Sequence, residues 1–298
     1  MSQSPPSPIR DLDRLNLDID RIHELAESLL PVYAQIELGE TLPNPEQNQA
    51  LVALIAILHE LHPADMATVL ESLPLQERVL VWKLGAPEED GEVLLEVSEP
   101  VRETLIETMD KAELLAAVDD LDADELAELA PDLPNQVVYE ALSTRDEEER
   151  AQVAAAMSFA DDQVGAIMDF ELVSIRADVS CEVVLRYLRR FESLPDHTDK
   201  IFVVDDDDIL QGVLPIRKLL VVDPDTQVAD IMADDVVIFR PEDDVEEAAQ
   251  AFERYDLVTA PVVDANKKLI GRITVDEMVD VIREESEADM LNMTCLRR

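Results

Sequence analysis

Short amphipathic segments follow one another between about residues 50 and 160. An apolar residue closes each segment, and these residues recur every 11 to 13 positions. Each segment has room for a helix of about 8–10 residues and a tight turn, often marked by Pro, Asp or Ser. No helix of this length buries its apolar face alone, so we expect stacked helix pairs that build a superhelix, preceded by a leading helix over 17–40. The recurring residues are Leu61, Leu73, Leu84, Val97, Met109, Leu121 and Leu133.

From residue 164 onward the pattern changes to short runs rich in Val and Ile. These runs form one unit that occurs twice, with most matching positions 59 residues apart. Each copy reads as strand, helix, strand, turn, strand and helix, and the Val and Ile content is typical of a small buried sheet. In the first copy we expect these elements at 172–178, 181–190, 201–206, 210–216 and 217–222. The matching positions are 203–205 with 262–264, Gly212 with Gly271, and, at an offset of 64, 167–168 with 231–232.

The last predicted helix, 274–290, is amphipathic and strongly acidic. Val275, Met278, Val279 and Ile282 form an apolar stripe at helical spacing. Its acidic residues form like-charge pairs four positions apart, and each such pair weakens a helix by a few tenths of a kcal/mol. The pairs are Asp276 with Asp280, Asp280 with Glu284, and Glu285 with Asp289. A helix with this charge pattern is more stable when a cation neutralises it.

The acidic bias extends over the whole chain. The 298 residues include 68 Asp and Glu against 24 Lys and Arg, which gives a net charge of −44, while 47% of residues are hydrophobic. Such a chain can fold, repels nucleic acid and anionic lipid, and attracts cations. Because Lys is scarce, adaptation to high salt is one explanation of the charge, but it does not account for acid concentrated at particular places.

Neither the cysteines nor the apolar runs point to secretion or to a membrane span. Cys181 and Cys295 have no redox or metal spacing, which favours a reducing cytoplasm. The first residues lack the apolar core of a signal peptide and are expected to form a flexible arm. The longest apolar run, 50–58, is nine residues, whereas a membrane-spanning helix needs about 20. We expect no direct insertion into a bilayer.

The duplicated unit resembles a pair of CBS domains, with the closest match in "PVVD", "LIG" and "ITVDE" between 261 and 277. A helical repeat directly before such a pair and an acidic helix directly after it resemble the cytosolic part of the MgtE-type magnesium transporter family. The resemblance implies a magnesium-sensing module whose acidic interfaces close on Mg²⁺ and gate a pore. It also implies a homodimer, and a transmembrane pore domain that the present sequence does not contain.

The resemblance assigns Mg²⁺ ligands to acidic residues in three places. Mg²⁺ prefers oxygen ligands and keeps much of its water, so it can bridge carboxylates with modest affinity. Ala288 stands where the family usually has a further acid. The assigned ligands are Asp124 and Glu128 in the helical domain, Asp244, Glu246 and Asp256 in the second CBS unit, and Glu277, Asp280, Glu285 and Asp289 in the acidic helix.

Other motifs were weighed and set aside. The run "VDDDDILQG" lacks the Glu that closes an EF-hand loop and reads as a hairpin turn. His59 and His62 lack the spacing of a zinc helix, which leaves helix packing or capping. In CBS domains a [ST]-x-x-D segment holds the ribose of an adenine nucleotide, but the segments here are "PIRK" at 215–218 and "TVDE" at 274–277. ATP binding is therefore expected to be weak or absent, although Lys218 could meet a phosphate.

We therefore predict an all-α helical-repeat superhelix followed by a tandem CBS pair of β-α-β-β-α units, and no enzyme activity. The predicted function is magnesium sensing in the cytoplasm, or at the cytoplasmic face of the membrane if the chain is attached to its pore. Two alternatives stay open, a stand-alone CBS regulatory protein that binds an adenine nucleotide and a structural adaptor. The predicted boundaries are a flexible arm at 1–16, a helical domain at 17–163, CBS units at 164–225 and 226–283, and the end of the acidic helix with a tail at 284–298.

Overall fold

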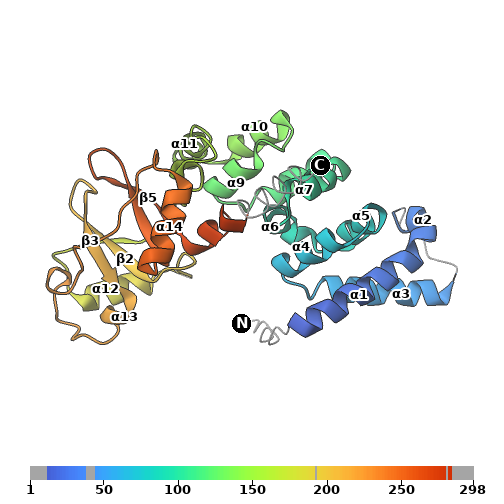
Figure 1. The fold of residues 1–298 in the computed structure, drawn as a ribbon, viewed down its shortest axis with the longest axis horizontal. Helices are drawn as coiled ribbons and strands as arrows, with labels where there is room; N and C mark the ends of the chain where they lie inside the picture. The colour runs from blue at the N-terminus through green and yellow to red at the C-terminus, as the bar shows by residue number, and fades with distance from the viewer. Residues whose placement is uncertain (1–11, 38–43, 192, 280, 284–298) are drawn as a thin grey trace, which may run out of the picture. The chain divides into compact units, whose positions relative to one another are not determined.

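The computed structural model describes residues 12–37, 44–191, 193–279 and 281–283 (Figure 1). The chain divides into two compact units, and each is described by itself. One unit consists of residues 1–125 and 129–144, and the other of 126–128 and 145–298. The main division falls between residues 144 and 145, ahead of residue 163, where the sequence predicts the end of the helical domain.

The first unit is helical from its first described residue, so α1 includes residues 12–16 of the segment expected to be an arm. Proline in the first turn, where its missing N–H costs nothing, begins α3, α4 and α7, and a capping box on Asp110 begins α8. The elements are α1 (Leu12–Leu29), η1 (Leu30–Val32), α2 (Tyr33–Glu37), α3 (Pro45–Leu58), α4 (Pro63–Ser72), α5 (Leu75–Leu84), η2 (Pro87–Glu89), α6 (Asp90–Glu96), α7 (Glu99–Thr108), α8 (Lys111–Ala117), α9 (Ala123–Leu129) and α10 (Asn135–Thr144).

Helices of this unit pack against helices close to them in the chain. α1 contacts α3, α4 and α5, α4 contacts α6, and α6 contacts α7 and α8, as expected of a helical repeat. The recurring apolar residues lie at the ends of the short helices or in the turns that follow them. Leu61 and Leu84 are half-buried, and the others are buried: Leu73, Val97, Met109, Leu121 and Leu133.

The second unit begins with α11 and contains two small sheets. The first sheet has the order β1-β2-β3, in which β1 and β2 are parallel and β2 and β3 antiparallel; the second is the antiparallel pair β4-β5. Residues 275–279 and 281–283 continue as a helix after β5. The elements are α11 (Glu147–Ala156), η3 (Val164–Ala166), β1 (Ser174–Arg176), α12 (Cys181–Leu188), β2 (Lys200–Val204), β3 (Leu210–Pro215), α13 (Ile216–Leu219), η4 (Val228–Asp230), α14 (Val245–Tyr255), β4 (Thr259–Val263) and β5 (Leu269–Thr274).

The repeat of the sequence is also a repeat of the backbone. A register shift between Val203 and Val204 in β2 recurs between Val262 and Val263 in β4. The copies differ at their first strand, because in the second copy it is reduced to a single bridge from Phe239 to Val262. Pro241 follows closely and has no N–H to extend the pairing.

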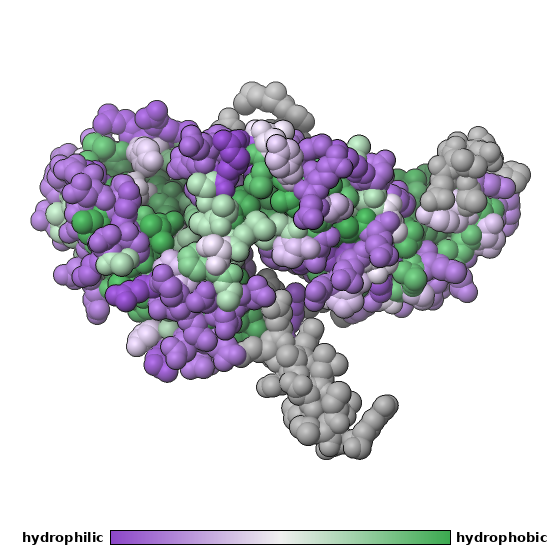
Figure 2. Space-filling view, turned by 90° about the horizontal axis from the view of Figure 1, so that it is seen from above, coloured by the Kyte–Doolittle hydropathy of each residue, from purple (hydrophilic) through white to green (hydrophobic). Residues whose placement is uncertain are grey.

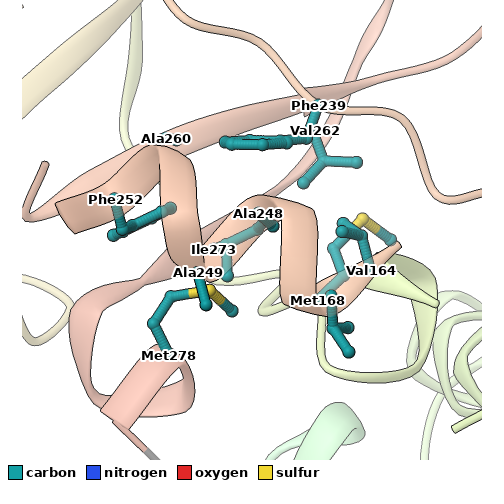
Figure 3. Packing of buried hydrophobic residues seen from close by; sticks show 11 residues of the cluster. Val164, Met168, Phe239, Ala248, Ala249, Phe252, Ala260, Val262, Ile273 and Met278 are labelled. Carbon is teal, nitrogen blue, oxygen red and sulfur yellow. The ribbon is translucent and has the colours of Figure 1, made fainter. Parts of the chain in front are cut away.

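Each copy has its own apolar core. The core of the first contains Val184 of α12 and Val203 of β2, and that of the second contains Phe252 of α14 and Ile273 of β5. Val164 and Met168, which precede β1 in the chain, lie in the core of the second copy, beside α14 (Figure 3). The segment that follows α11 therefore belongs structurally to the second CBS copy.

Candidate metal site

Helix α14 positions three of the predicted ligands, at its two ends. Asp244 is the N-cap, and its Oδ1 accepts a hydrogen bond of 3.0 Å from the amide of Glu247. Glu246 is exposed in the first turn. Asp256 is exposed at the C-terminal end with φ 50° and ψ 48°, a left-handed conformation that Asp tolerates better than most residues. The eleven residues of α14 separate Asp244 from Asp256 by about 18 Å, so within one chain they cannot bind the same ion.

Helix α9 positions the two predicted ligands of the helical domain. Asp124 is half-buried in its first turn, and Glu128 is exposed one turn later. This spacing places both carboxylates on one side of the helix. Their joint action as ligands stays a prediction.

Glu277 is half-buried and hydrogen-bonded at the start of the last helix. Its Oε2 accepts a hydrogen bond of 2.8 Å from the amide of Thr274 and another from the Thr274 hydroxyl. The pKa of Glu277 is raised to about 7, mainly by burial and also by the carboxylates of Asp276 and Asp169, while the hydrogen bonds from Thr274 lower it. A carboxyl group in this position caps the helix and is less available to an ion than the exposed carboxylates of α14.

The remaining predicted ligands, Asp280, Glu285 and Asp289, lie outside the described residues. Within the described parts of the chain, no three His, Cys, Asp or Glu residues come together as a site for one metal ion. The described predicted ligands lie on three separate elements, α9, α14 and the last helix, and their role as ligands stays a prediction.

Sequence reasoning did not single out Asp90, the first residue of α6. Its pKa is raised to about 7, mainly by burial and also by the carboxylate of Glu113, while the ammonium of Lys83 lowers it. Lys83 Nζ lies 3.0 Å from Glu113 Oε2. Asp90 was missed because it resembles many acids at the start of helices, and only the folded structure brings α5 and α8 beside it.

A second missed feature is the buried ion pair between Arg272 of β5 and Asp169. Arg272 is 4% exposed, and its Nη2 lies 2.6 Å from Asp169 Oδ2. A signal for this pair is present in the internal repeat. Arg272 matches Val213 at the offset of 59, and Asp169 matches Ala233 at the offset of 64. Two opposite charges thus stand in one copy where the other copy has two apolar residues.

The two segments weighed as nucleotide sites have local partners. Lys218 Nζ donates a hydrogen bond of 2.6 Å to the carbonyl of Ile231. In the other segment the Thr274 hydroxyl donates to the carboxylates of Asp276 and Glu277. A phosphate at Lys218 or a ribose at Glu277 would have to replace these bonds.

Two of the motifs set aside have the predicted structures. The "DDDD" run is the hairpin turn between β2 and β3, where Asp205 Oδ1 accepts hydrogen bonds of 3.0 Å from the amides of Asp207 and Ile209. His62 is the N-cap of α4, and its Nδ1 accepts from the amide of Ala64. Neither motif needs a metal to explain it.

The fold and the distribution of acid define the chain as an acidic helical domain joined to a tandem CBS pair. Hydrophilic residues cover most of the face shown in Figure 2, as the net charge leads one to expect. Two family models match, the MgtE intracellular N domain over residues 61–162 and the CBS domain over 228–284. The chain belongs to the MgtE family of magnesium transporters and corresponds to the cytosolic part of that family.

Individual relatives agree with this membership. The magnesium transporter MgtE of Thermus thermophilus is 33% identical over 261 residues, which is 85% of this chain and 57% of that protein. MgtE of Bacillus subtilis is 26% identical over 78% of this chain and 52% of its own length. The chain thus spans about half the length of the curated relatives it matches.

Solved structures confirm the fold. The cytosolic domain of the Mg²⁺ channel MgtE, crystallised in complex with ATP, is 31% identical and superimposes with a TM-score of 0.68 over 86% of this chain and 99% of that one. The soluble part of a magnesium transporter is 25% identical, with a TM-score of 0.65 over 89% of this chain and 99% of that one. Among the described helices of this chain, none is long and apolar enough to cross a bilayer.

Proposed function

We propose that the chain is a magnesium-sensing module that regulates the pore of an MgtE-type transporter, and that it is not an enzyme. The observation that carries the proposal is the match over 86% of the chain to the cytosolic domain of a Mg²⁺ channel. The resemblance assigns ligands to acidic residues of α9, of α14 and of the helix after β5. The predicted domain boundaries and ligands are part of the proposal.

The physical basis of sensing is the repulsion between carboxylates. Two carboxylates about 5 Å apart repel each other by about 3 kcal/mol at an effective dielectric constant near 20. Mg²⁺ binds oxygen at about 2.0–2.1 Å and retains water, so an ion between two acidic faces converts the repulsion into attraction. The faces approach at high magnesium and separate at low magnesium.

The positions of the carboxylates support a response that depends on domain closure. Asp244 and Asp256 cap opposite ends of α14, about 18 Å apart, and α9 contributes a third acidic face. Each ion therefore needs ligands or water from another element to complete its coordination. Binding of several weak ions then favours the closed arrangement, and a difference of about 1–3 kcal/mol between the two arrangements is typical of such coupling.

Small-angle scattering with magnesium and with sodium at equal ionic strength tests the proposal. The sodium control is needed because screening alone relaxes repulsion in a chain of net charge −44. We expect millimolar magnesium to compact the protein more than sodium does. If sodium produces the same compaction, the acidic residues serve only as a solvated surface.

A variant with Asp124, Asp244, Asp256 and Asp280 replaced by Asn should lose the magnesium-specific compaction and stay folded. Asn is as good an N-cap as Asp at position 244, and it tolerates the left-handed conformation at position 256. A control variant loses the same charge from exposed acids elsewhere, Glu103→Gln, Glu107→Gln, Asp207→Asn and Asp225→Asn. Compaction that persists in the first variant, or disappears equally in both, contradicts the ligand assignment.

The proposed partners are a second copy of the chain and the transmembrane pore domain of the transporter. Closed two-fold pairs are the commonest form of protein assembly, and we expect the contact to lie within 164–285. Sedimentation of the protein at micromolar concentration with magnesium should give the mass of a dimer. A monomer under these conditions would remove the dimer from the proposal.

An adenine nucleotide is a second candidate ligand, because the similar cytosolic domain was crystallised with ATP. The local partners of Lys218 and Thr274 favour weak binding in this chain. Titration calorimetry with ATP decides whether the chain binds the nucleotide tightly or weakly. Micromolar affinity that is lost on replacing Thr274 would support the stand-alone nucleotide-binding alternative.

A further inference from the structure

Arg272 is a buried cation whose hydrogen bonds join three separate segments of the chain. In β5 its guanidinium donates from Nε to Asp169 Oδ2 at 2.7 Å and from Nη1 to the carbonyl of Asp196 at 2.7 Å. Nη2 lies 2.6 Å from the same Asp169 oxygen. Asp169 precedes β1, and Asp196 lies in the connection between α12 and β2. One side chain thus links strand β5 to the segment before β1 and to the connection between α12 and β2 in the first copy.

The backbone reinforces the contact between Asp169 and Arg272. The amide of Asp169 donates to the carbonyl of Arg272 at 3.0 Å, and the amide of Arg272 donates to the carbonyl of Asp169 at 2.9 Å. A Cβ on Gly271 would lie 2.4 Å from Met168 Cγ and 2.9 Å from the Asp169 carbonyl oxygen. Gly271 therefore permits the close approach of this segment to β5.

Residues 164–169, the segment that contains Asp169, contact the second copy at both of their ends. The amides of Val164 and Gly165 donate to the carbonyls of Asp243 and Pro241, at 2.9 and 2.8 Å. Val164 and Met168 pack in the apolar core beside α14 (Figure 3). In chain order this segment follows α11, and β5 leads directly into the acidic helix. The ion pair therefore connects the exit of the helical domain to the base of that helix.

The first copy contains the matching contact without charge. Val213 and Ala233 form the matching backbone bridge, with two hydrogen bonds of 2.8 Å. Apolar side chains are thus sufficient to hold this joint. A buried ion pair is not needed for stability, since apolar replacements of similar volume are often neutral or stabilising. The charged joint has a directional geometry instead, because two N–H groups of one guanidinium converge on one carboxylate oxygen.

We propose that Arg272 is a positioning residue that transmits magnesium-dependent movement of the helical domain to the acidic helix. The inference rests on the proposed magnesium-sensing function and adds the route of transmission. The Asp169–Arg272 pair holds the segment after α11 and the strand before the acidic helix as one body. An apolar joint holds the same backbone bridge but lets the two segments shift against each other.

Hydrogen exchange of the full chain, followed by mass spectrometry, tests the inference. Exchange is measured with magnesium and with sodium at equal ionic strength, in residues 123–129 and in residues 275–283. In the wild type we expect magnesium to slow exchange in both segments. In the double variant Asp169→Leu/Arg272→Met, 123–129 keeps its response, and the response of 275–283 falls about fivefold or more, the lower end of typical coupling between sites.

A matched control makes the same replacements at an exposed pair, Arg176→Met/Asp206→Leu, in which Arg176 and Asp206 side chains are 39% and 89% exposed. This control should respond as the wild type does in both segments. The variant Arg272→Lys keeps the buried charge but not the converging donors, and we expect a reduced response in 275–283. If the double variant does not fold, the response of Arg272→Lys becomes the deciding measurement.

The possible outcomes separate the two proposals. If segment 275–283 of the double variant responds as in the wild type, the positioning role is overturned and the proposed sensor function remains. If the double variant does not fold, the same result in Arg272→Lys has this meaning. If the wild type responds to magnesium no more than to sodium in either segment, the proposed function fails and the inference with it. Loss of the response in both segments of the double variant also contradicts the inference, because the joint would then affect binding itself.

Discussion

The two CBS copies share a backbone and differ in the chemistry of three matching places. The register shift at Val203/Val204 recurs at Val262/Val263, and Gly212 recurs as Gly271. Three differences set the second copy apart. It has the pair Arg272 and Asp169 where the first has Val213 and Ala233, and Thr274 and Glu277 where the first has Pro215 and Lys218. Its helix and second strand are joined by three residues, 256–258, whereas the first copy has eleven, 189–199. Glycines and apolar residues preserve the repeat, while charge accumulates in the copy that leads to the acidic helix.

The sharpest test of this difference is the single substitution Asp169→Leu. It leaves the Arg272 guanidinium buried without its carboxylate, and the free energy of unfolding should fall by about 3–5 kcal/mol. The double variant with Arg272→Met should recover most of this loss. Urea unfolding at neutral pH measures both. A loss below 1 kcal/mol would mean that water or another group solvates the guanidinium.

The second prediction concerns Glu277, whose counterpart in the first copy is Lys218. The folded pKa is about 7 against an ordinary value of 4.5, so between these pH values the folded protein binds more protons than the unfolded one. Its contribution to stability therefore falls as pH rises from 4.5 to 7, by about 2–3 kcal/mol. Glu277→Gln should remove this slope in urea unfolding, and Lys218→Gln should not. An unchanged slope in Glu277→Gln would assign it to other groups.

The third prediction compares the two glycines of the repeat. A Cβ at position 212 would lie 2.4 Å from the backbone oxygen of Ala233, whereas at position 271 the shortest contacts are to the flexible side chain of Met168. Both alanine variants should lose stability, by about 1–3 kcal/mol, with the larger loss for Gly212→Ala. Thermal unfolding ranks them. The opposite order would mean that the Ala233 backbone yields more easily than the Met168 side chain.

The smallest effect is expected in the helical unit, where the His23 imidazole on α1 contacts the buried Glu77 carboxylate of α5. The hydrogen bond and charge of Glu77 raise the pKa of His23 above 6.5. Its stabilising contribution is complete below pH 6.5 and is lost as pH rises through the folded pKa. In the wild type we expect the melting temperature to decrease slightly as pH rises above 6.5. This decrease should be absent in His23→Gln and present in His59→Gln. A decrease that survives in His23→Gln would exclude this contact as its cause.

Much of the fold follows from short-range patterns. The recurring apolar residues mark the ends of the short helices, the "DDDD" run forms the predicted hairpin turn, and the internal offset of 59 reappears as matching strands. These features depend on a few neighbouring residues and on side-chain periodicity. The predicted first strand of the second copy was reduced to one bridge at Phe239, because Pro241 interrupts pairing that the apolar residues before it would favour.

The candidate site was predicted less completely. The spacing of Asp124 and Glu128 on one helix face could be expected from the sequence, but the exposure of each carboxylate could not. Glu277 was expected to be a ligand, and the structure places it in a half-buried cap with Thr274. Burial depends on residues far away in the chain, and it decides whether a carboxylate faces an ion or a neighbouring amide.

The sequence by itself determined the acidic character, the helical repeat and the duplicated unit, since composition and periodicity are properties of the chain alone. The resemblance to the family came from the CBS motifs and the order of the domains. Only the tertiary structure decided which charges meet. Arg272 and Asp169 are 103 residues apart, and Asp90 and Glu113 lie on different helices. Chain folding brings such groups together through loop closure and packing, and pairing of this kind leaves no local pattern in the sequence. The physical reason is that Coulomb energy depends on distance and burial in the folded protein, not on separation along the chain.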